Sequence, residues 1–172
     1  IRPALSCLED IHCLPMPDPA EAFPAREMIH CVELLRRHYG PEVAIIATGD
    51  QAPFTLAALL LGLEAWLVAV EENRQPELLH AALSLAQRYA IRYAEALRRA
   101  GADVVRFGDS FGGTQVVSPR TYHAWTFPYE RGLIDALKPL GLFTSIHICG
   151  NATPILEGMV GTGASMIEVD EL

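Results

Sequence analysis

Short apolar runs alternate with longer amphipathic stretches along most of this 172-residue chain. Four runs of strand length are mainly apolar: Val43–Thr48, Ala102–Gly108, Phe143–Cys149 and Ser165–Val169. A continuous apolar run of this length, in contrast to an alternating one, is typical of a parallel strand that is covered on both faces. We therefore expect a buried parallel sheet, with Val43–Thr48 covered on both of its faces.

The stretches between these runs have helical periodicity and helix-ending residues. Pro76 suits the first turn of the longest helix, and Gly101 suits the position that follows its end. The predicted helices are Pro24–His38, Pro53–Leu61, Glu64–Glu72, Pro76–Arg99, Ser118–Trp125, a helix that ends at Leu137 after a break at Phe127–Tyr129, and Thr153–Val160. Strands and helices that alternate in this way predict a parallel sheet with right-handed crossovers.

Two architectures have this order of elements, a doubly wound open sheet and a segment of a (β/α)8 TIM barrel. The connection of more than fifty residues between Thr48 and Ala102 is long for a nucleotide-binding sheet, and no glycine fingerprint follows the first strand. Four strands are half of what a barrel needs. We expect an α/β fold in which residues 1–172 form a single domain, a partial (β/α)8 TIM barrel.

The composition and net charge of the chain exclude some classes of binding partner. Hydrophobic residues make up 51% of the chain and charged residues 20%, as in a globular domain with a real core. A net charge of -8 argues against nucleic acid and anionic membranes, which both attract positive surfaces. The longest apolar candidate, Ala57–Leu63, is far shorter than the roughly 18–20 residues of a membrane helix. The expected partners are small molecules or proteins.

The four cysteines, Cys7, Cys13, Cys31 and Cys149, have no paired spacing of the kind that predicts a disulfide scaffold. A reducing cytoplasm is therefore the expected location, and no targeting signal is recognised at residue 1. The chain opens on Ile1 instead of methionine, which suggests that sequence precedes it.

Polar side chains gather at the C-terminal ends of all four predicted strands: Asp50, Asp109, His147 with Cys149, and Glu168 with Asp170. Both α/β architectures place their functional sites at this edge. Glu168 and Asp170 share a strand face and are candidate metal ligands, proton carriers or groups that orient ligands. The alternatives are that Asp50 and Asp109 cap the turns that they enter, and that the acidic end of the chain is solvated.

His147 and Cys149 are the most informative pair in the chain. Alternate residues of a strand point to the same face, so the imidazole and the thiol project together at the strand end. Zinc accepts one nitrogen and one sulfur donor at about 2.0–2.3 Å, so this pair can form half of a metal site. The alternative is a buried histidine beside an inert core cysteine. The nearby loop Ser110–Thr114 contains two glycines, which allow positive φ or the close approach of a ligand.

Several segments together resemble one protein family. These segments are Ala52-Pro53-Phe54-Thr55-Leu56-Ala57, Ala100-Gly101-Ala102-Asp103, Gly108-Asp109-Ser110, Ser118-Pro119, Pro128-Tyr129 and His147-Ile148-Cys149-Gly150-Asn151. From about Pro17 to Leu172 the chain resembles the uroporphyrinogen decarboxylase superfamily, and it is most similar to the cobalamin-dependent methyltransferases of the methylcobamide:coenzyme M type. The Ala-Pro-Phe-Thr segment marks the superfamily, and the His-X-Cys-Gly-Asn segment is more specific, because the decarboxylases lack this pair.

The resemblance implies a (β/α)8 barrel of about twice this length with a catalytic zinc at its mouth. His147 and Cys149 match the first two protein ligands. The third ligand of the family is a cysteine far downstream of this pair, and Cys7, Cys13 and Cys31 lie upstream and do not match it. We therefore expect the chain to be the central portion of a larger protein.

The activity that the resemblance implies is methyl transfer between a corrinoid protein, which carries methylcobalamin, and a small thiol or methylated substrate. Bound zinc lowers the pKa of the thiol, and the direction of transfer stays open. We assign Glu168 or Asp170 a supporting role near the metal, and Asp109 and Asp50 a role in lining the pocket. The candidate catalytic groups are Asp109, Glu168 and Asp170, and the candidate cofactor contacts are Asp50 and Asn151.

Two alternatives remain. One is a metal-free decarboxylase that acts on a tetrapyrrole carboxylate, a chemistry that needs cationic residues to hold several substrate carboxylates. The strand ends of this chain are acidic instead. The other alternative is a nonenzymatic or degenerate barrel in which the His-X-Cys pair has only a structural role.

Overall fold

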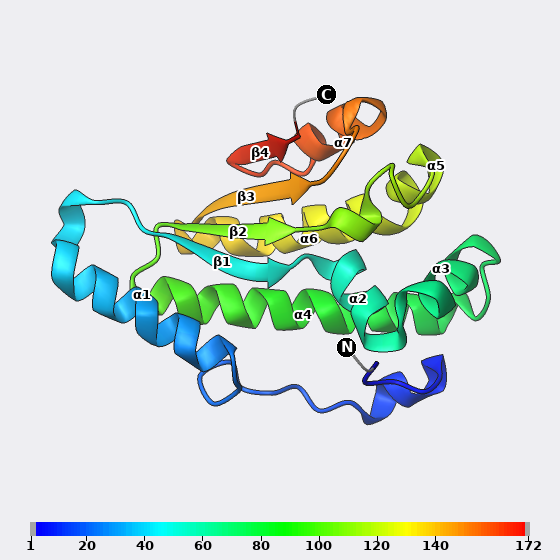
Figure 1. Cartoon of the computed structure of the whole chain (residues 1–172), viewed down its shortest axis with the longest axis horizontal. Coiled ribbons are helices and arrows are strands. Elements are labelled where there is room, and N and C mark those ends of the chain that lie inside the picture. Colours follow the sequence, from blue (N-terminus) through cyan, green and yellow to red (C-terminus); the bar gives the residue numbers. More distant parts are fainter. Residues whose placement is uncertain (1–2, 171–172) are drawn as a thin grey trace.

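The computed structural model describes residues 3–170, which form one four-stranded parallel sheet in the order β1-β2-β3-β4 (Figure 1). The strands are β1 (Ile46–Gln51), β2 (Val104–Gly108), β3 (Phe143–Ile148) and β4 (Met166–Val169). The chain adds each strand beside the previous one and never reverses direction, whereas a doubly wound sheet reverses its strand order at a switch point. The sheet therefore has the order of a barrel segment, and the predicted α/β class is confirmed.

Helices connect the strands and cover one face of the sheet. They are α1 (Ala25–Tyr39), α2 (Pro53–Leu61), α3 (Leu63–Glu71), α4 (Pro76–Ala100), α5 (Pro119–Thr121), α6 (Phe127–Leu137) and α7 (Leu156–Gly161). The longest, α4, contacts α1, α2 and α6, and Figure 1 shows it running alongside the sheet. Among the described residues no single helix is long and apolar enough to cross a membrane; α2 and α3 pass that test only as a pair, which is bent by 114°.

The core behind the sheet follows from the alternation of side chains along the strands. Val105 and Phe107 of β2 are fully buried against Leu97 of α4 and Leu133 of α6. Burying a large apolar side chain contributes about 1.5–3 kcal/mol, so these contacts hold the helices on this face. A second apolar cluster contains Ile146 and Ile148 of β3 together with Trp66 of α3, and all three side chains are fully buried.

The prediction that β1 is covered on both faces is wrong. Ala47 is buried, but its neighbour Ile46 is 62% exposed, and Phe143 at the start of β3 is 61% exposed. The helices cover one face, and within residues 3–170 no element packs over the other. In a closed barrel this second face is the interior, so its apolar side chains account for the continuous apolar runs in the sequence.

The first strand also lies three residues further along the chain than predicted. Gly40–Glu42 form a 3-10 turn, and the Ile45 amide donates to the side chain of Asp103 at 2.8 Å before regular pairing with β2 begins. The strand then continues through Gly49, where a Cβ atom would lie 2.4 Å from the ring of Phe107. A glycine is therefore required where β1 packs on β2.

The predicted break at Phe127–Tyr129 does not separate two helices. Residues Tyr122–Thr126 form a π-helical turn between α5 and α6, and Pro128 sits in the first turn of α6, where its missing N–H is tolerated. The predicted helix Thr153–Val160 begins with a 3-10 turn, Thr153–Ile155, so that α7 starts three residues later than predicted. The helices α1 to α4 lie within one residue of their predicted bounds.

Candidate functional site

His147 and Cys149 lie together at the end of β3, on the face of the sheet that no described element covers. Their Nε2 and Sγ atoms are 3.2 Å apart, and the His147 side chain is 19% exposed. Two donors bound to one tetrahedral zinc at about 2.0 and 2.3 Å would be about 3.5 Å apart. A small rotation of either side chain brings the pair to that separation, so the geometry fits half of a zinc site.

The loop after β2 approaches the same sulfur. The Ser110 hydroxyl lies 3.0 Å from Sγ of Cys149. The approach depends on Gly113, because a Cβ atom there would lie 2.4 Å from Cγ2 of Ile148. Gly113 therefore permits close approach, but the group that approaches it is the side chain of Ile148, and the approach of a ligand to this loop stays a prediction. We did not predict Ser110 as a site residue, and its position three residues before Gly113 was the available signal.

Asp170 follows β4 and lies beside His147. Its Oδ1 atom is 3.9 Å from Nε2 of His147, and its Oδ2 atom accepts a hydrogen bond of 2.6 Å from the backbone amide of Gly150. Gly150 has a φ of 80°, in the left-handed region that glycine adopts without strain. The turn after β3 therefore holds a carboxylate near the His147–Cys149 pair.

Glu168 of β4 pairs in register with His147 of β3, so it lies beside the His147–Cys149 pair. It accepts hydrogen bonds from Nε of Arg106 at 2.6 Å and from the hydroxyl of Ser145. Partial burial opposes ionisation, but the hydrogen bonds from Ser145 and Arg106 outweigh it, and the pKa of Glu168 lies below its ordinary value. Arg106 was not among the predicted site residues, although a cation inside an otherwise apolar strand was a visible signal.

Asp109 lies in a different environment from these residues. Its side chain is fully buried and accepts hydrogen bonds from the backbone amides of Thr55 at 2.7 Å and Phe54 at 3.4 Å, at the N-terminus of α2. Burial raises its pKa to about 6, although the hydrogen bonds from Thr55 and Phe54 act in the opposite direction. Asp109 therefore caps the N-terminus of α2, and not the turn that it enters as the capping alternative had it; its catalytic role stays a prediction.

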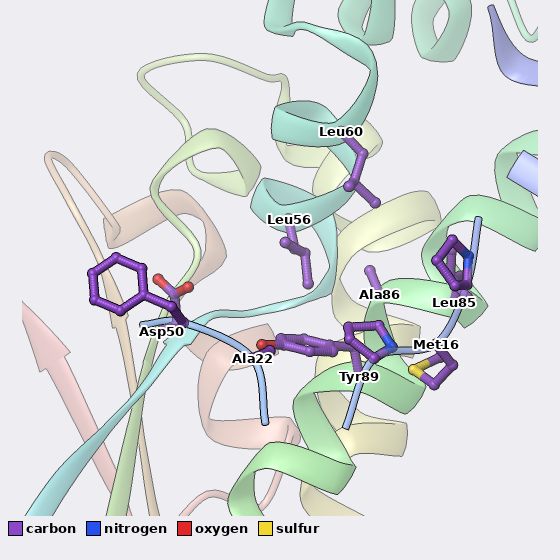
Figure 2. Close-up of a pocket in the computed structure, with 11 residues that line it drawn as sticks. Met16, Ala22, Asp50, Leu56, Leu60, Leu85, Ala86 and Tyr89 are labelled. Atoms are coloured by element: carbon purple, nitrogen blue, oxygen red, sulfur yellow. The ribbon is translucent and has the colours of Figure 1, made fainter. Parts of the chain in front are cut away.

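Asp50 and Asn151, the candidate cofactor contacts, lie apart from each other. Asp50 is the next-to-last residue of β1 and lies beside a cavity of about 290 Å³ (Figure 2). The Asn151 side chain accepts a hydrogen bond of 3.0 Å from the amide of Thr153, and its carbonyl accepts one from the hydroxyl of Thr114. The structure thus groups His147, Cys149, Glu168 and Asp170, but not Asp50 or Asn151. Their roles in binding stay predictions.

The donor set is incomplete as a metal centre within the described chain. Among residues 3–170, no group of three or more His, Cys, Asp or Glu side chains is close enough to hold one ion. The Nδ1 atom of His147 is buried and has no hydrogen-bond partner in the same range. The Nε2 atom faces Cys149 and Asp170, and it is the nitrogen that this arrangement would offer to an ion.

The sequence is similar to that of known proteins, which gives evidence independent of the site geometry. The Uroporphyrinogen decarboxylase (URO-D) family matches residues 1–172. The methylcobamide:CoM methyltransferase MtbA of Methanosarcina acetivorans is 31% identical over 144 residues, which cover 84% of this chain and 41% of that protein. The uroporphyrinogen decarboxylase of Carboxydothermus hydrogenoformans is 30% identical over 147 residues, which cover 83% and 41%.

A solved structure has the same arrangement of elements. A methyltransferase from Methanosarcina mazei superposes with a TM-score of 0.84 and 25% sequence identity, covering 92% of this chain and 46% of that one. The chain therefore spans less than half the length of each of these relatives.

Proposed function

The chain belongs to the uroporphyrinogen decarboxylase family, and from this membership we propose that it contributes to zinc-dependent methyl transfer between a corrinoid protein and a thiol or methylated small substrate. The observation that carries the proposal is the 3.2 Å separation of His147 Nε2 and Cys149 Sγ on the open face of the sheet. The similarity to proteins named as methylcobamide:CoM methyltransferases supports the same reaction class.

In this proposal His147 and Cys149 supply two protein ligands to zinc, and a third protein ligand completes the set. Zinc, when bound, acts as a Lewis acid that keeps a coordinated thiol deprotonated at neutral pH, which makes the sulfur a methyl acceptor. The reaction also needs one open coordination position, which a set of three protein ligands leaves.

The neighbouring side chains would hold this pair in place. Ser110 lies within hydrogen-bonding distance of the Cys149 sulfur, and donation to that sulfur would moderate the charge of the thiolate. The Asp170 carboxylate lies near His147, and the Gly150 amide donates a hydrogen bond to its second oxygen. Glu168 remains ionised through its contacts with Arg106 and Ser145, and this ion pair would hold the strand beside His147 in register.

The corrinoid would be carried by a separate protein that docks at the carboxyl edge of the sheet, where Asp50 and Asn151 also lie. The relatives' names support a methylcobamide as one reactant. We place the reaction in the cytoplasm, because the chemistry needs Cys149 as a free thiol, and all four cysteines are free in the structure.

Decarboxylation of a tetrapyrrole is the second candidate, since a uroporphyrinogen decarboxylase is 30% identical to the chain. That reaction needs cations to hold substrate carboxylates. Within the described sheet Arg106 is already paired with Glu168, and Asp50 and Asp170 add negative charge near the carboxyl ends of the strands. These charges favour methyl transfer.

Metal analysis of the purified full-length protein, in which the third protein ligand is expected, tests the proposal. We expect about one equivalent of zinc in the wild type, and its loss in His147→Ala and Cys149→Ser. The matched controls are His38→Ala and Cys31→Ser, exposed residues of α1 that should leave the zinc content unchanged.

A reaction assay then separates the candidates. Methylcobalamin is incubated with a panel of thiols, and loss of its absorbance reports demethylation. Zinc-free wild-type protein would overturn the proposal, and release of carbon dioxide from a porphyrinogen would favour the decarboxylase.

A further inference from the structure

The cavity beside Asp50 has the composition of a ligand pocket. Its volume of about 290 Å³ is at the lower end of the range of small-molecule sites, about 300–1,000 Å³. Only Asp50 and Tyr89 bring polar side-chain groups to it within the described chain. The remaining lining is apolar and comes from the segment before α1 and from α2 and α4: Pro15, Met16, Pro17, Ala22, Phe23, Leu56, Leu60, Leu85 and Ala86.

The backbone of β1 changes direction at Asp50. Thr48 pairs with Arg106 and Gln51 with Gly108, so β1 contains one more residue than β2 over this interval, as in a β-bulge. Asp50 itself has a φ of 66°, in the left-handed region that non-glycine residues rarely adopt. Bulges of this kind re-aim a side chain and recur beside functional sites. Here the bulge brings the Asp50 carboxylate to the pocket.

The carboxylate is not neutralised by the protein. Asp50 forms no ion pair with any residue in the range 3–170, and its side chain accepts one long hydrogen bond, 3.3 Å, from the adjacent Gln51. In Figure 2 the Tyr89 ring extends from α4 across the pocket, with its hydroxyl end nearer to Asp50. Burial raises the pKa of Tyr89, and the negative charge of Asp50 raises it further, so Tyr89 stays a neutral phenol beside the carboxylate.

We propose that this pocket binds a small organic cation of the methylated-ammonium class. The Asp50 carboxylate compensates the positive charge, and the face of an aromatic ring such as Tyr89 attracts it. N-methyl groups need no hydrogen-bond acceptors and therefore suit walls made of Leu56, Leu60 and Leu85. Asp50 is exposed to solvent, so its carboxylate needs no partner in the empty pocket; an anionic ligand is repelled by its charge, and a neutral ligand gains no attraction from it.

The pocket is distinct from the His147–Cys149 pair. Asp50 lies near the end of β1 and Cys149 follows β3, and β2 lies between these strands. Adjacent strands are about 4.8 Å apart, so the two positions are on the order of 10 Å apart at the same edge of the sheet. Interpreting the cation as the methylated substrate rests on the proposed function, whereas binding of the cation can be measured without zinc or a corrinoid.

Choline and its neutral isostere 3,3-dimethylbutan-1-ol, in which carbon replaces the nitrogen, are the probes. Isothermal titration of the wild-type protein should give measurable choline binding that weakens with added salt, and at least tenfold weaker binding of the isostere. Asp50→Asn should lower choline affinity about tenfold. Tyr89→Leu should lower it about two- to fivefold, as expected for a partly exposed cation–π contact.

The matched control is Asp135→Asn, which removes the same charge from the exposed face of α6 and should leave choline affinity unchanged. Equal binding of choline and the isostere, no binding of choline, or equal losses in Asp50→Asn and Asp135→Asn would each overturn the inference. Zinc content is measured on the same samples. Protein that binds choline but contains no zinc contradicts the proposed function only. Protein that contains zinc but does not bind choline contradicts this inference only.

Discussion

Replacing Gly113 with alanine tests whether the loop after β2 is held against β3 by close packing. The added Cβ would lie 2.4 Å from Cγ2 of Ile148, 3.4 Å from the carbonyl oxygen of Ser110 and 3.5 Å from that of Cys149. Ile148 is fully buried and has no free space to enter. The loop must therefore withdraw, by about 1 Å, to restore ordinary van der Waals contact.

The size of the effect follows from this displacement. Overpacking a closely packed site costs about 1–3 kcal/mol, so the free energy of unfolding should fall by that amount. The contact between Ser110 Oγ and Cys149 Sγ, 3.0 Å in the structure, lengthens toward about 4 Å and is lost as a hydrogen bond. Loss of a group that supports a metal ligand weakens metal binding about 10–100-fold.

Urea unfolding followed by tryptophan fluorescence, to which the buried Trp66 and the partly buried Trp125 contribute, measures the stability. Competition with a chelator measures zinc affinity. Gly161→Ala is the control, because its Cβ would come no closer than 3.4 Å to the Phe127 ring. The reasoning is refuted if Gly113→Ala has the same unfolding midpoint and zinc affinity as the wild type. If only the stability falls, the loop packs as described but Ser110 does not support the metal ligand.

Three further predictions concern the scaffold. Burial raises the pKa of Glu130 well above its ordinary value of 4.5. The free energy of unfolding should therefore fall as pH rises above 4.5, because the unfolded chain releases this proton more readily than the folded one. Glu130→Gln should make this fall shallower in urea titrations between pH 5 and pH 8. Ile146→Ala removes a fully buried side chain of β3 and should lower the free energy of unfolding by about 2–5 kcal/mol in the same titrations. Ser118→Ala removes the cap that accepts from the Thr121 amide at 3.0 Å and should cost about 1 kcal/mol, measured by thermal unfolding.

Each of these predictions has an opposing result. An unchanged pH dependence in Glu130→Gln would mean that this carboxyl group is ionised inside the fold. A loss below about 1 kcal/mol in Ile146→Ala would mean that the site behind β3 collapses around the smaller residue. Ser118→Thr keeps the capping oxygen, so a loss as large as that in Ser118→Ala would exclude the cap as the cause.

Local periodicity was sufficient to predict the elements and one half of the candidate site. The alternation of apolar runs and amphipathic helices indicated a parallel sheet, because each pattern depends only on which faces of a segment are buried. The shared face of His147 and Cys149 follows from the two-residue repeat of a strand, which needs no information about neighbouring segments.

The same local reasoning failed where coverage depends on distant segments. The run Val43–Thr48 is apolar on both faces, but Ile46 is exposed because only one face is covered by described helices. A continuous apolar run records where side chains are buried in the complete fold, and it does not identify what buries them.

What the sequence determined by itself was the order of strands and helices and the placement of polar side chains at the strand ends, because these depend on neighbours along the chain. Only the tertiary structure decided which side chains at the strand ends lie close together. Loop packing at Gly113 brings Ser110 to Cys149, strand register pairs Glu168 with His147, and a bulge turns Asp50 toward a pocket of its own. Each of these outcomes is set by contacts between segments far apart in sequence, where a shift of one residue would move a side chain to the opposite face.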